Sequence, residues 1–121
     1  MTPAARLQAA IEILDEVIAS ARSEGAPADA IVTRYFKQRR YAGSGDRRAV
    51  RELVFRAIRR TSERPESGRA AVVGLAYDDS SLRELFGQPR GPQPVQQGEP
   101  VATAGIIPGW MMAAPPSTHL F

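Results

Sequence analysis

The sequence predicts an all-α fold, a bundle of about five helices followed by a proline- and glycine-rich C-terminal tail. Apolar residues recur at three- and four-residue steps, which is typical of helices with one buried face. Proline, glycine and small polar residues stand where such helices would begin or end. A chain of 121 residues that is 43% hydrophobic suits one small domain. We expect a helical domain over residues 1–86 and a linker with a tail over residues 87–121.

Two helices are predicted before the first glycine-rich break. Thr2 is placed to cap a helix that starts at Pro3 and ends near Gly25. Its apolar positions are Leu7, Ala10, Ile11, Leu14, Ile18 and Ala21. Pro27 opens a second helix, which should end near Arg40 because glycines follow. Its apolar positions are Ala28, Ile31, Val32, Tyr35 and Phe36. A two-helix hairpin is therefore expected at the start of the chain.

A third helix is predicted after Ser44 or Gly45, either of which suits the cap, and the helical signal weakens after Thr61. Asp46 suits the positive end of the helix dipole. The apolar positions Val50, Leu53, Val54, Ala57 and Ile58 fall within roughly 140° at 100° per residue. With Leu7, Ile11, Leu14 and Ile31 they form the expected core.

Two shorter helices are predicted next. Pro65 suits the first turn of a fourth helix through Ala76, with Gly74 inside it at a cost of about 1 kcal/mol relative to alanine. The pattern from Ser81 to Glu84 is a capping box, so a fifth helix should start there and end at Gly87. We interpret the preceding Asp78-Asp79 pair as capping residues rather than catalytic carboxylates.

Residues 87–100 have the composition of a linker. Four prolines stand there among glutamines and glycines, so the segment is poor in apolar surface to bury. His119, the single histidine, follows in the tail, where we expect no metal-binding or acid–base role for it.

Positive charge is concentrated in one segment. Residues 34–60 contain ten basic residues against two acidic ones, an excess of +8 in a chain whose net charge is +3. All but one of the ten are arginines, whose planar guanidinium suits phosphate oxygens. A nucleic-acid backbone is therefore the expected partner. A solvated helix face, held by pairs such as Arg48 with Glu52, is the alternative.

Aromatic residues accompany this charge. Tyr35 and Phe36 could stack on bases, but their helical spacing favours core packing. Tyr41 lies beside Arg39 and Arg40 in a predicted loop and is the better candidate for stacking.

The run Gly45-Asp46-Arg47-Arg48-Ala49-Val50-Arg51-Glu52-Leu53-Val54-Phe55-Arg56-Ala57-Ile58-Arg59 resembles the third helix of the N-terminal domain of the Nop/Sun family of RNA cytosine-5 methyltransferases, the ribosomal RNA small-subunit methyltransferase B type. The segments 31–36 and 107–111, Ile-Val-Thr-Arg-Tyr-Phe and Ile-Pro-Gly-Trp-Met, stand in the order expected for that family. The resemblance implies a NusB-like helical domain that binds ribosomal RNA ahead of a catalytic domain using S-adenosylmethionine.

The catalytic features of that family are missing from this sequence. Its chemistry needs a glycine-rich cofactor loop and two cysteine thiolates, whereas this chain has no cysteine. We therefore expect no catalytic residue, bound cofactor or metal in this chain. The resemblance implies a truncated or frameshifted product whose methyltransferase domain is a missing partner.

Composition excludes other classes. Without cysteine there are no disulfides or thiolate zinc sites, which is compatible with a reducing compartment, and the expected location is the cytoplasm. No apolar run approaches the roughly 18 residues of a membrane span.

The expected function is RNA binding through phosphate contacts. The predicted contact residues are Arg39, Arg40, Arg47, Arg48, Arg51, Arg59 and Arg60. Two alternatives stay open: a NusB-like antitermination protein that binds RNA with a protein partner, and a protein-interaction module that uses the third helix or the region of Trp110.

Overall fold

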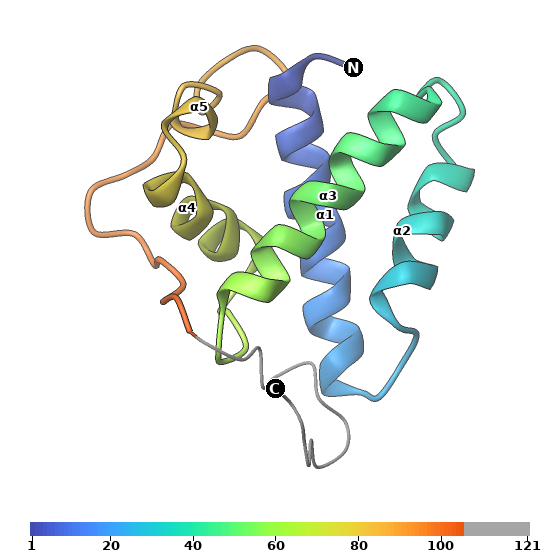
Figure 1. The fold of residues 1–121 in the computed structure, drawn as a ribbon, viewed down its shortest axis with the longest axis horizontal. Coiled ribbons are helices and arrows are strands. Elements are labelled where there is room, and N and C mark those ends of the chain that lie inside the picture. Colours follow the sequence, from blue (N-terminus) through green and yellow to red (C-terminus); the bar gives the residue numbers. More distant parts are fainter. Residues whose placement is uncertain (106–121) are drawn as a thin grey trace.

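The computed structural model describes residues 1–105, which fold into five α-helices without a β-sheet (Figure 1). The helices are α1 (Pro3–Arg22), α2 (Ala28–Lys37), α3 (Ser44–Arg60), α4 (Gly68–Asp78) and α5 (Ser80–Arg83). Helix α1 is central and packs against α2, α3 and α4. In Figure 1, α2 lies on one side of α1, and α4 with α5 lies on the other. The prediction of an all-α bundle is confirmed for this part of the chain.

Helix α1 begins as its sequence predicts. The backbone N–H of Ala5 donates to the Thr2 hydroxyl over 3.0 Å, and Pro3 occupies the first turn. One such cap contributes about 1 kcal/mol to helix stability. At the crossing with α4, a Cβ at Gly68 would lie 2.2 Å from the Ile11 carbonyl oxygen, so glycine permits this close approach. The Gly68 N–H also donates to the Asp15 carboxylate over 2.7 Å.

Helix α2 ends at Lys37, three residues before the predicted end. Arg39, Arg40 and Tyr41 therefore lie in the turn that leads to α3. Helix α3 is capped at Gly43, whose N–H donates to the Asp46 carboxylate over 3.0 Å. The predicted core is buried except for Leu53, which is partly buried against it.

The predicted start of α4 was wrong. Pro65 is buried in the connection after α3, and the helix begins at Gly68 because the Ser67 hydroxyl accepts the Ala70 N–H over 3.0 Å. Helix α5 starts one residue before the predicted cap because the Asp79 carboxylate accepts the Ser81 N–H over 3.0 Å. The interpretation of the Asp78-Asp79 pair as capping residues is confirmed for Asp79, whereas Asp78 is the last residue of α4 and pairs with Arg60.

Residues 87–105 contain no helix, but they pack against the bundle. Their path runs beside α5 and then beside α4 (Figure 1). Glu99 accepts a 2.7 Å ion pair from Arg69, and the Ala102 N–H donates to the Ala70 carbonyl over 3.0 Å. A linker composition therefore does not prevent this segment from packing, because backbone groups and charged side chains of α4 hold it.

Two sequence features lie outside the described residues: the Ile-Pro-Gly-Trp-Met segment at 107–111 and His119. Of the helices in residues 1–105, none combines the length and apolar character needed to cross a membrane.

Candidate nucleic-acid interface

Four cations of the basic segment are exposed and have no partner within residues 1–105. They are Lys37, Arg40, Arg47 and Arg48. They occupy the end of α2, the turn that follows and the first turns of α3. We call these four residues the free basic end. Their charge is directed to solvent, where an anion meets no protein carboxylate that it must first displace.

The acidic residue nearest in sequence to Arg47 is already engaged. Asp46 accepts the backbone N–H of Gly43 at 3.0 Å and an ion pair from Arg6 at 2.9 Å. These two contacts hold the pKa of Asp46 below its usual range. The carboxylate therefore stays ionised and committed to Gly43 and Arg6, and it does not pair with the neighbouring arginines.

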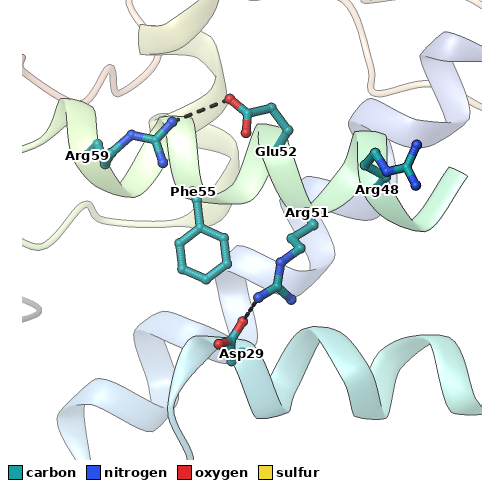
Figure 2. Close-up of a pocket in the computed structure, with 6 residues that line it drawn as sticks. All are labelled: Asp29, Arg48, Arg51, Glu52, Phe55 and Arg59. Atoms are coloured by element: carbon teal, nitrogen blue, oxygen red, sulfur yellow. Dashed lines mark hydrogen bonds and ion pairs between the residues drawn. The ribbon is translucent and has the colours of Figure 1, made fainter. Parts of the chain in front are cut away.

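The second half of α3 is different, because its arginines are paired. Figure 2 shows Arg51 directed toward Asp29 at the start of α2, with which it forms an ion pair. On the same face of α3, Arg59 pairs with Glu52 over 3.4 Å. Phe55 separates these two pairs in a shallow groove of about 370 Å³. Arg48 stands at the far end of the same view without a dashed line.

Two more arginines of α3 join it to α4 and its flanking residues. Arg56 pairs with Asp79 over 3.1 Å, and the Ser81 hydroxyl together with Arg56 lowers the pKa of Asp79. Arg60 pairs with Asp78 over 2.7 Å and donates to the Ala102 carbonyl over 2.8 Å, with only 13% of its side chain exposed. We call Arg51, Arg56, Arg59 and Arg60 the paired basic end.

Arg39 lies between these two arrangements. Its guanidinium carbon is 3.7 Å from the centroid of the Tyr35 ring, and its Nη1 donates to the Tyr35 carbonyl over 3.1 Å. The Tyr35 hydroxyl donates to Glu12 over 2.6 Å, and burial together with this carboxylate raises the pKa of Tyr35. Tyr35 and Phe36 are buried, which confirms core packing, whereas Tyr41 is 75% exposed.

The structure thus divides the arginines that the sequence predicts to bind RNA. Arg40, Arg47 and Arg48 are free, Arg39 is stacked, and Arg51, Arg59 and Arg60 are paired. Sequence reasoning left out Lys37, although it was counted in the charged segment, and Arg90, which approaches α1 from the expected linker. The position of Lys37 in the last turn of a helix could have identified it as a candidate. No feature of the sequence pointed to Arg90.

Comparisons with known protein families, curated proteins and solved structures found no significant match.

Proposed function

We propose that this chain is an RNA-binding helical domain of the NusB-like kind that precedes the catalytic half of Nop/Sun ribosomal RNA methyltransferases. The observation that carries the proposal is the free basic end, where Lys37, Arg40, Arg47 and Arg48 are exposed and unpaired. The resemblance of segment 45–59 to the third helix of that domain supports it.

The chemistry of these side chains favours a polyanion. Guanidinium groups donate two parallel hydrogen bonds to a phosphate, and several adjacent contacts release condensed counterions from the nucleic acid. The first turn of α3 adds the positive partial charge of a helix N-terminus to the same end. An RNA strand that crosses the α2–α3 turn would therefore meet four cations in sequence.

This role assigns no chemical step to the chain. Cysteine nucleophiles are absent from the sequence, so methyl transfer from S-adenosylmethionine would need a separate methyltransferase domain. The proposed domain would hold ribosomal RNA for that partner in the cytoplasm.

A charge-reversal pair tests the proposal. We expect Arg47→Glu with Arg48→Glu to weaken binding of a structured ribosomal RNA fragment at least tenfold at about 0.1 M salt. Because both positions lie in the first turns of α3, glutamate suits the helix dipole and the fold should not suffer. Fluorescence anisotropy measures the affinity, and thermal unfolding checks the fold.

The matched control is Arg22→Glu with Arg64→Glu, which changes the net charge equally at two other exposed arginines without partners in residues 1–105. We expect this control to lose less than threefold. Equal losses in the two variants would show that only total charge matters and would overturn the proposed interface.

A second candidate function rests on a different surface. Val73, Tyr77, Phe86 and Val95 line an apolar groove of about 330 Å³ beside α4, and Tyr77 is 61% exposed. Such a surface favours a protein partner, as in the antitermination or protein-interaction alternatives. A partner that binds through this groove should be lost in Tyr77→Ala, and for an antitermination protein it should raise the RNA affinity.

A further inference from the structure

A second hollow lies at the same end of the molecule as the free basic end. The first half of α1, the last residues of α2 and the α2–α3 turn enclose a pocket of about 380 Å³, and Arg90 closes one side. Tyr41 and Arg39 contribute to its wall, and both belong to the turn that carries Arg40. Arg40 of the free basic end is thus flanked in the sequence by two residues of the pocket wall.

Two flat groups in the wall suit a nucleobase. Tyr41 is 75% exposed and does not belong to the hydrophobic core, so its ring is accessible to a ligand. The Arg39 guanidinium is fixed in place by its stacking on Tyr35 at 3.7 Å and by its bond to the Tyr35 carbonyl. Aromatic rings and guanidinium planes are the usual platforms on which proteins stack unpaired bases.

The α1 side of the pocket offers hydrogen-bond acceptors. Glu12 already accepts the Tyr35 hydroxyl over 2.6 Å and the Gln8 amide over 3.1 Å. These bonds leave carboxylate lone pairs and the Gln8 carbonyl oxygen for a ligand. A base edge rich in N–H donors fits such a wall, and guanine presents two neighbouring donors on its Watson–Crick edge.

The side of the pocket formed by Arg90 depends on an unusual backbone conformation. Arg90 has a φ of 66°, in the left-handed region that non-glycine residues seldom adopt. A Cβ on the next residue, Gly91, would lie 2.7 Å from the Ala4 Cβ and 2.9 Å from the Leu85 carbonyl oxygen. The glycine therefore lets this turn pack against α1, which positions Arg90, without a partner in the described part of the chain, at the pocket.

We infer that this pocket takes one unpaired nucleobase of the bound RNA, preferably guanine, stacked on Tyr41 and Arg39 while Arg90 contacts a neighbouring phosphate. The inference rests on the proposed function and deepens it, because it makes the target a single-stranded segment of RNA. Base pairing would bury the edge that faces Glu12 and deny the base entry to the pocket.

The test compares Tyr41→Ala with the control Tyr77→Ala, an exposed tyrosine of the apolar groove. The probe is a twelve-nucleotide oligouridine with one central guanosine, measured single-stranded and as a duplex by fluorescence anisotropy. We expect Tyr41→Ala to weaken single-strand binding about tenfold, because stacking of one base on an aromatic ring has roughly that effect. Duplex binding, and both affinities of Tyr77→Ala, should change less than twofold.

Tyr41→Phe keeps the ring and should bind like the unchanged protein, which separates stacking from any role of the hydroxyl. Replacing the guanosine by uridine should weaken binding severalfold in the unchanged protein but not in Glu12→Gln. Equal single-strand affinities for Tyr41→Ala and the unchanged protein would overturn the base pocket. If Arg47→Glu with Arg48→Glu still weakened binding, the proposed function would stand without it; no RNA binding at all would overturn both.

Discussion

The two ends of the basic segment carry similar numbers of cations but use them differently. At the free basic end, Lys37, Arg40, Arg47 and Arg48 have no partners within residues 1–105. At the paired basic end, each arginine of α3 meets a carboxylate. A count of arginines along the sequence therefore overstates the charge that a ligand would meet. The field available to an anion is concentrated where α2 turns into α3.

Tertiary structure produces this division. Three of the four carboxylates of the paired basic end come from elements that the chain brings beside α3: Asp29 from the start of α2, and Asp78 and Asp79 from the end of α4; the fourth, Glu52, belongs to α3 itself. At the other end the nearest acidic residue, Asp46, is held by Gly43 and Arg6. Arginines of one helix thus stabilise the fold at one end and remain available at the other.

The largest expected difference between the two ends is in stability. Arg60→Ala removes an ion pair to Asp78 and leaves the Ala102 carbonyl without its donor, so we expect a loss of about 1–3 kcal/mol. Arg48→Ala removes an exposed side chain that has no partner within residues 1–105, and it should change the free energy of unfolding by less than about 0.5 kcal/mol. Urea denaturation measures both, and equal losses would contradict a structural role for Arg60.

A slightly smaller loss of stability is expected on substitution of Gly74, whose missing side chain leaves room for the Arg60 guanidinium. A Cβ there would lie 2.4 Å from an Arg60 guanidinium nitrogen and 2.7 Å from the Ala102 carbonyl oxygen. Helix propensity alone favours Gly74→Ala by about 1 kcal/mol, but overpacking against backbone costs about 1–3 kcal/mol. We expect urea denaturation to show a net loss in the free energy of unfolding. A gain in stability would show that the chain around Ala102 does not pack against Gly74.

The smallest expected effect is the pH dependence of Asp79, which accepts the Ser81 hydroxyl and pairs with Arg56. The pKa of Asp79 is lowered in the folded protein, so its contribution is present above the usual aspartate pKa and disappears as pH falls through the lower folded value. Asp79→Asn keeps the cap on α5 but removes the charge. The variant should unfold more easily near neutral pH and match the unchanged protein at about pH 2. A constant difference in urea midpoint would contradict this origin.

Local sequence was sufficient for much of the fold. Thr2 caps α1, and the apolar positions of α1, α2 and α3 are buried as their periodicity predicts, except for Ala21 and Leu53, which are partly buried. The start of α4 was predicted wrongly because Pro65 and Ser67 are both good starting signals, and only the buried position of Pro65 decides between them. Gly74 was expected to weaken α4. The structure explains why glycine stands there, because Arg60 and Ala102, which are distant in the sequence, leave no room for a side chain.

The candidate interface could be predicted only as a segment. Charge density identified residues 34–60, but pairing depends on which carboxylates the fold brings near each arginine. Segment 87–105 shows the same limit, because its composition gives no sign that Arg69 binds Glu99 or that Arg90 reaches α1. The resemblance to a methyltransferase front domain stays a prediction.

The most direct measurement is the salt dependence of RNA binding at matched positions on the two ends. Arg47→Gln with Arg48→Gln, and Arg51→Gln with Arg59→Gln, remove the same charge from the same helix. Each lost phosphate contact on a single strand lowers the slope of log affinity against log salt by about 0.7. We predict a slope reduced by about 1.4 for the first pair and by less than half of that for the second. Equal or reversed reductions would contradict the assignment of RNA binding to the free basic end.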